Sequence, residues 1–224
     1  MFLCSGHFGP TSSPIMARRT KEEAQATRSH ILDTAELVFE KRGVSRTSLH
    51  EIAQAAGVTR GAIYWHFQDK ADLFNAMMER VTLPMEEAVK RGDDPLLADP
   101  LDKIRRSFAE VLQKTASDPQ VQRVFEIATH KVEYVDELQS VRARHLSVRN
   151  ECMAAVESTL KLATRRGLLG RSVPARAAAI GLHALIDGLL QNWMLDPTAF
   201  DLVRTGRQVL NAYLAGLASP ASPA

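Results

Sequence analysis

The segment from Ser48 to Lys70 has the pattern of two short helices joined by a tight turn. Ser48 is followed three residues later by Glu51, a capping box that begins the first helix. Gly57 ends that helix, because glycine adopts the left-handed conformation beyond a helix terminus without steric cost. Thr59 then stands where its hydroxyl can cap the second helix. This arrangement predicts a helix-turn-helix.

The second helix of this motif has two different faces. Ile63 and Phe67 supply its buried stripe, so the other residues are left to the surface. That surface carries Tyr64 and Trp65, and two exposed aromatics are costly unless they meet a partner. A DNA groove, lined by thymine methyls and phosphates, is such a partner. Packing against a neighbouring helix is the alternative, and for His66, which lies nearer the packed face, a structural role is nearly as plausible.

Composition limits the class of protein only broadly. The chain has 224 residues, 45% of them hydrophobic and 24% charged, as in an ordinary globular protein. The formal net charge is only +2, so the motif and not the charge carries the argument for DNA. Two cysteines, Cys4 and Cys152, fit a reducing compartment, and no run approaches the roughly 18 apolar residues of a membrane span. We therefore expect a cytoplasmic protein.

Helical periodicity and terminators predict an all-α chain of about nine helices. Beside the two motif helices, helices are expected at 21–42, 69–91, 101–116, 119–133, 137–166, 174–195 and 198–217. The expected domains are 16–68, which contains the helix-turn-helix, and 69–218, with 1–15 as a disordered extension or an upstream start and 219–224 as a disordered tail.

One of the longer helices contains a proline. Pro84 should kink the helix expected at 69–91, because it removes a backbone donor and clashes one turn back. The inward positions expected on that helix are Leu73, Phe74, Met77, Val81, Met85 and Val89. A polar, proline-bearing loop is expected at 92–100.

Longer strings of sequence resemble a known family. TRGAIYWHFQDKADLF, preceded by GVSRTSLHEIAQAAGV, is similar to the DNA-binding domain of TetR-type transcriptional regulators. The string MARRTKEEAQATRSHILDTAELVFEKRGV resembles the AcrR/TtgR branch, repressors of multidrug efflux operons. The later strings DPLDKIRRSF, FEIATHKVEY and LIDGLLQNWML agree more loosely.

The resemblance implies a homodimer that represses transcription from a near-palindromic double-stranded operator until small hydrophobic or cationic drug-like ligands release it. Thr47 and Ser48 would touch phosphates, and Lys70 would clamp a phosphate at the start of the next helix. The residues that the resemblance assigns to DNA are Arg28, Thr47, Ser48, His50, Thr59, Arg60, Gly61, Ala62, Tyr64, Trp65, His66 and Lys70.

The C-terminal half offers candidates for a ligand site. His183 and Asp187 are four residues apart, so they share one face of an otherwise apolar helix. A carboxylate there is expensive unless it is paired, which leaves either a His–Asp pair in the core or a polar handle at a ligand cavity. The resemblance adds the pocket positions Ile104, Phe108, Val111, Phe125, Cys152, Val156, Ile186 and Leu190, any of which could equally be plain core.

Further patterns bear on dimerisation and chemistry. Gly181 and Gly188 mark close approach of a second helix, either in a dimer contact or within the chain. His130 and Glu133 form a single H-x-x-E, too few ligands for a metal, and no cofactor or catalytic motif is expected. The competing hypotheses are a TetR-type regulator of a non-efflux pathway that senses a metabolite or acyl signal, and a helical enzyme or scaffold.

Overall fold

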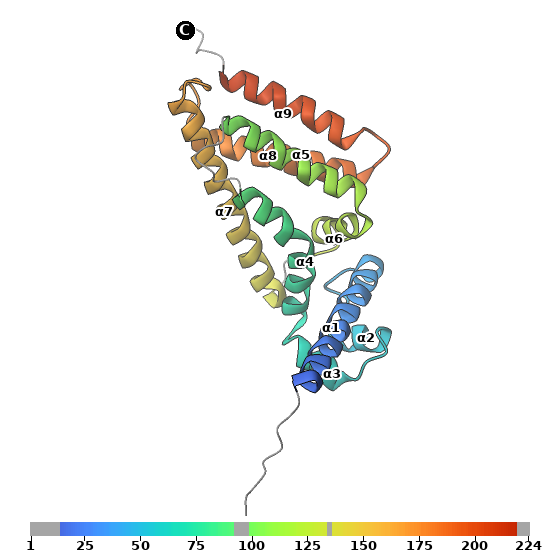
Figure 1. Ribbon diagram of the computed structural model, residues 1–224. Helices are drawn as coiled ribbons and strands as arrows, with labels where there is room; N and C mark the ends of the chain where they lie inside the picture. The colour runs from blue at the N-terminus through green and yellow to red at the C-terminus, as the bar shows by residue number, and fades with distance from the viewer. Residues whose placement is uncertain (1–13, 92–98, 134–135, 219–224) are drawn as a thin grey trace, which may run out of the picture.

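The computed structural model describes residues 14–91, 99–133 and 136–218, and it is helical throughout, with no strand in these ranges (Figure 1). Its helices are α1 (Pro14–Arg42), α2 (Leu49–Ala55), α3 (Arg60–His66), α4 (Lys70–Arg91), α5 (Pro100–Ser117), α6 (Pro119–His130), α7 (Gln139–Arg165), α8 (Ala175–Leu195) and α9 (Leu202–Ala218), with a 3-10 turn, η1 (Asp136–Leu138). The all-α prediction is confirmed. Within the described ranges, no helix is long and apolar enough to cross a bilayer.

The helix-turn-helix forms through the local signals in its sequence. Ser48 Oγ accepts from the Glu51 amide at 3.3 Å, and Glu51 Oε2 accepts from the Ser48 amide at 2.8 Å, which completes the capping box. Gly57 has a φ of +66°, the left-handed conformation that the turn requires. The motif is therefore built as the sequence predicts.

Three predicted helix boundaries differ from the structure by more than two residues. The first helix begins at Pro14 and not near Lys21, because the residues from Met16 to Arg19 are good helix formers and proline is tolerated in a first turn. The helix expected at 119–133 ends at His130. The last helix begins at Leu202 and not at 198, because Asp201 Oδ1 accepts from the Arg204 amide at 2.9 Å and so caps it there.

Other predictions lie partly outside the described residues. These are the extension at 1–13, the loop at 92–98, the tail at 219–224 and the side chain of Val89. Of the remaining inward positions on α4, Leu73, Phe74, Met77 and Val81 are buried, and Met85 is partly buried.

Two hydrophobic cores organise the molecule. The first unites α1, α2, α3 and the start of α4 with α6 and η1, and Phe39 and Phe74 meet inside it with ring centroids 6.2 Å apart. The second is formed by α5, α7, α8 and α9. In Figure 1, α4 runs from the α1–α3 unit up toward α5, alongside α7. Helices α4 and α6 therefore connect the helix-turn-helix to the rest of the protein.

Two glycines allow the helices of the second core to cross closely. A Cβ at Gly206 would overlap the Leu112 side chain, and one at Gly181 would overlap the Tyr213 hydroxyl. That hydroxyl donates to the Ala178 carbonyl at 3.0 Å, so Gly181 serves contact within the chain. A Cβ at Gly188 would meet no atom of the described residues within 4 Å, so this glycine is open in the single chain.

Candidate DNA-reading surface and ligand cavity

Helix α3 is held against the first core by one face and is capped at its N-terminus. Ile63 and Phe67 are 0% and 1% exposed, and they anchor the helix on the first core. Thr59 Oγ1 accepts from the Ala62 amide at 3.1 Å, as the capping prediction requires. The orientation of α3 is therefore set, and its opposite face is free to meet a partner.

That opposite face carries the two aromatics, which do not pack against a neighbouring helix. Tyr64 is 47% exposed and Trp65 is 73% exposed. The Arg60 guanidinium lies 5.6 Å from the centroid of the Tyr64 ring, and the His66 ring meets Trp65 edge-on at 4.6 Å. Burial, together with the nearby Arg28 guanidinium, lowers the pKa of His66 and so favours the uncharged ring.

The remaining candidates surround this face. Ser48 and His50 are exposed at the start of α2, and Gly61 is exposed at the start of α3. Ala62 is half-buried. Arg28 lies with its guanidinium 4.9 Å from the centroid of the Phe67 ring, half-buried beside α3. Exposed Arg46, which is not among the residues predicted from the sequence, adds a further cation just before α2.

Two residues assigned to phosphates do not face outward. Thr47 is 2% exposed, and its hydroxyl donates to the Gly43 carbonyl at 2.8 Å. The Lys70 side chain is 5% exposed, and its Nζ lies 2.9 Å from Glu137 Oε2 and 3.4 Å from the Ser45 carbonyl. Each polar group already has a partner within the protein, so neither is placed for the phosphate contact expected from the sequence.

Substitution of Lys70 by alanine should therefore lower stability and leave the salt dependence of operator binding unchanged. The ammonium joins α4 to η1, and a lysine that meets no phosphate releases no counterion from DNA. Thermal melting and operator titrations at several salt concentrations test this. A slope reduced by about one would mean that Lys70 leaves Glu137 for a phosphate.

A large cavity lies between α4, α5, α6, α7 and α8. Its volume is about 560 Å³, within the range of small-molecule sites. All ten ligand candidates line it: Ile104, Phe108, Val111, Phe125, Cys152, Val156, His183, Ile186, Asp187 and Leu190. The walls are mostly apolar, with a small number of polar groups, as in sites that bind drug-sized molecules.

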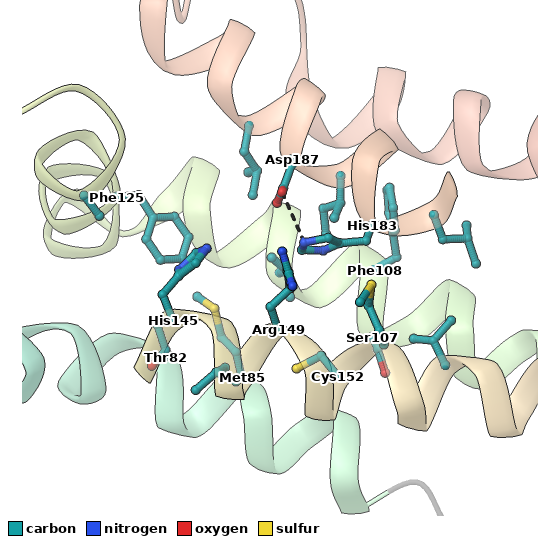
Figure 2. A pocket seen from close by; sticks show the side chains of 18 of the residues that line it. Thr82, Met85, Ser107, Phe108, Phe125, His145, Arg149, Cys152, His183 and Asp187 are labelled. Carbon is teal, nitrogen blue, oxygen red and sulfur yellow. Dashed lines mark ion pairs between the residues drawn. The ribbon is translucent and has the colours of Figure 1, made fainter. Parts of the chain in front are cut away.

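His183 and Asp187 are paired and also line the cavity. His183 Nε2 lies 3.3 Å from Asp187 Oδ2, and the two side chains are 29% and 48% exposed. Figure 2 shows the pair extending from α8 into the space that faces α7. The structure therefore places this pair at the cavity and not in the core, so its polar atoms can contact a ligand.

The cavity also contains basic residues that were not predicted from the sequence. Arg144, His145 and Arg149 from α7 and Lys103 from α5 line it. His145 and Arg149 are four residues apart and share a helix face, but their sequence lacks the apolar surroundings that drew attention to His183. Only the packing of α7 against α4 and α5 shows that this face points inward.

A buried carboxylate on α1, which packs against the helix-turn-helix, contacts α4 and α6, two of the helices that line the cavity. The Glu36 side chain on α1 is 2% exposed and pairs with Arg80 on α4. It also accepts from Gln120 Nε2 at 2.9 Å and lies 3.5 Å from Arg123 NH1, both on α6. Nearby, the Val44 amide donates to the Lys131 carbonyl at 3.0 Å. These contacts join α1 directly to α4 and α6.

Helix α3, here called the reading helix, is capped and exposed, and the same chain contains a separate cavity of ligand size. This combination is that of a DNA-binding regulator with a sensor domain. Residues 31–77 match the family model of bacterial regulatory proteins of the tetR family, and residues 99–218 match the C-terminal region of MAATS-type transcriptional repressors. The chain belongs to the TetR family of transcriptional regulators.

Individual relatives agree over most of the chain. It is 39% identical over 188 residues to the HTH-type transcriptional regulator TtgR of Pseudomonas putida, covering 84% of this chain and 90% of TtgR. NalD, the secondary repressor of the MexAB-OprM multidrug efflux pump in Pseudomonas aeruginosa, superposes with a TM-score of 0.80 at 37% identity, covering 88% of this chain and 98% of NalD.

A solved complex of SmeT with triclosan also shares the fold. SmeT is the repressor of the Stenotrophomonas maltophilia multidrug efflux pump SmeDEF. The complex has a TM-score of 0.77 and 31% identity to this chain, and it covers 85% of this chain and 91% of SmeT.

Proposed function

We propose that this protein is a dimeric repressor of a multidrug efflux operon that releases its operator when a small hydrophobic drug occupies the cavity. The observation that carries the proposal is one chain with both an exposed aromatic reading helix and an apolar cavity of about 560 Å³. NalD and SmeT are repressors of efflux pumps, and SmeT has been solved with triclosan, which supports this choice of pathway.

The proposed functions of the two domains are those expected from the sequence. Residues 16–68 read DNA, and residues 69–218 bind ligand and form the dimer. The proposed dimer surface is formed by α8 and α9. It includes Gly188, which has no neighbouring atom where a Cβ would lie, and the exposed apolar residues Ile180 and Val209. The protein acts where operator DNA is, in the bacterial cytoplasm, and it has no catalytic role.

Dimerisation gives the reading helices a required spacing. Two α3 helices enter successive major grooves when they are about 34 Å apart, because half-sites recur at one turn of the duplex. A ligand releases DNA only by favouring a state with another spacing. In the proposed mechanism, ligand displaces the cavity walls on α4 and α6, and the Glu36 contacts transmit that shift to α1.

A gel shift on the DNA immediately upstream of the gene tests this proposal. We expect a discrete complex that a panel of hydrophobic drugs dissociates in a dose-dependent manner. A complex that every drug leaves intact, but that a metabolite or acyl compound dissociates, would overturn the efflux role. No complex at any nearby operator-like sequence would contradict local repression.

Pro84 gives the mechanism a further test. This proline lies inside α4 on its exposed side, between the cavity-lining residues Thr82 and Met85. Pro84→Ala restores a helical hydrogen bond and stiffens the connecting helix. We expect the drug concentration for half-release to change at least about threefold, which is roughly 0.65 kcal/mol of coupling. Titrations of release measure this, with exposed Leu83→Ala as the control; equal values for wild type and Pro84→Ala would exclude a role for the proline.

A further inference from the structure

We propose that the cavity selects amphiphiles with an acidic group, and that Arg149 is its anion-binding residue. This inference rests on the proposed ligand-sensing function and gives its ligand a chemical class. Among the described side chains that line the cavity, Lys103, Arg144 and Arg149 are basic and Asp187 is acidic. A cationic side chain that borders a largely apolar space without an acidic partner favours a ligand of the opposite charge.

The two arginines of α7 have different partners. Arg144 Nε lies 2.8 Å from Glu79 Oε1 on α4, so its charge is already neutralised within the protein. Arg149 donates to the neutral side-chain carbonyl of Asn150, at 3.0 Å from NH2. Across residues 14–91, 99–133 and 136–218, no carboxylate lies within ion-pairing distance of Arg149. Its guanidinium, which has five donors, is therefore able to bind a ligand carboxylate, sulfonate or phenolate.

The neighbouring groups strengthen this assignment. His145 lies one helical turn before Arg149, and Figure 2 shows both side chains extending from α7 toward the region that His183 and Asp187 reach from α8. Asp187 lies 3.3 Å from the His183 ring, so the single acid of the wall, among the described residues, faces a histidine. Phe108, Phe125 and Met85 provide apolar surface beside these groups for the body of the ligand.

The proposed selectivity differs from one of the ligand classes that the family resemblance implies. The resemblance implies small hydrophobic or cationic drug-like ligands, and an unpaired Asp187 carboxylate would suit the cationic ones. With its partner in place, Asp187 is a poorer site for a ligand cation, and Arg149 opposes any cation that enters the same space. The favoured ligand is therefore an apolar molecule with an acidic end.

A matched pair of fluorescent probes tests this on the full-length protein. The anionic 8-anilino-1-naphthalenesulfonate and the neutral N-phenyl-1-naphthylamine share one ring system and differ by the sulfonate. Each is titrated, and each is used to displace the other, to show that they share a site. The variants are Arg149→Gln, Arg149→Lys and the control Arg142→Gln, which changes net charge equally from an exposed position of α7 that is not part of this cavity.

We expect Arg149→Gln to raise the Kd of the sulfonate about tenfold, the value of one charge-assisted hydrogen bond, and that of the neutral probe less than about twofold. Arg149→Lys should restore part of the affinity, Arg142→Gln should change neither probe, and Asp187→Asn should tighten the sulfonate. Equal loss of both probes, or an unchanged sulfonate Kd in Arg149→Gln, would overturn the anion assignment alone. If neither probe binds the wild type, the ligand-sensing function itself is contradicted.

Discussion

Replacing Trp65 or Tyr64 by alanine is expected to weaken specific operator binding by about 2–6 kcal/mol and to leave the fold intact. Each side chain projects from α3 with 73% or 47% of its surface exposed, so little packing is lost in the free protein. One base contact is worth about 1–3 kcal/mol, and a dimer presents it twice. Operator titrations give the affinity, and melting curves give the stability.

The control for this experiment is Leu37→Ala. Leu37 on α1 is also 47% exposed, and it lies outside the reading helix. Its substitution removes comparable apolar surface without removing a proposed base contact, so operator affinity should stay at the wild-type value. If Trp65→Ala and Tyr64→Ala bind operator as tightly as Leu37→Ala, then α3 is not the reading helix.

Removal of the Glu36 carboxylate should cost about 3–5 kcal/mol of folding free energy. Glu36→Ala leaves Arg80 and Arg123, which converge on a 2%-exposed side chain, without their shared partner. Breaking a buried pair is strongly destabilising. Each arginine keeps one further carboxylate, Asp33 at 2.7 Å from Arg80 and Glu40 at 3.5 Å from Arg123, so the loss should lie at the lower end of this range. Glu36→Gln keeps the shape and removes the charge, so it should cost less. Denaturant unfolding curves of the two variants measure both values.

Glu40→Ala is the matched comparison for Glu36. Glu40 is one turn further along α1, is 36% exposed and meets Arg123 at 3.5 Å. A surface pair of this kind contributes at most about 1 kcal/mol. Similar losses in Glu36→Ala and Glu40→Ala would show that the buried carboxylate does not hold α4 and α6 on α1.

The sequence could predict the helix-turn-helix because the signals that form it are local. The capping box of Ser48 and Glu51, the turn at Gly57 and the cap at Thr59 each act within a few residues, so they have the same meaning in the sequence and in the fold. The stripe of Ile63 and Phe67 likewise determines which side of α3 is buried. Helix ends were less predictable, because competing caps such as Asp201 differ little in energy.

The charged contacts could not be predicted in the same way, because their partners are distant in the chain. Lys70 meets Glu137, and Glu36 meets Arg80 and Arg123, only after α4, α6 and η1 have packed on the first core. Arg149 has an ordinary helical context, and its place at the cavity depends on the rotation of α7. The family resemblance supplied the apolar pocket positions, which share a helical spacing, but not the basic residues between them.

The two tryptophans of the chain lie on different helices, α3 and α8, and in different environments. Trp65 stands 73% exposed on the reading helix, whereas Trp193 on α8 is 8% exposed in the second core. Their fluorescence spectra therefore separate, with the emission of Trp65 at longer wavelength and that of Trp193 at shorter wavelength. The molecule therefore carries its own pair of optical reporters, one on α3 and one in the second core, so that changes at these two places can be followed in one sample without a label.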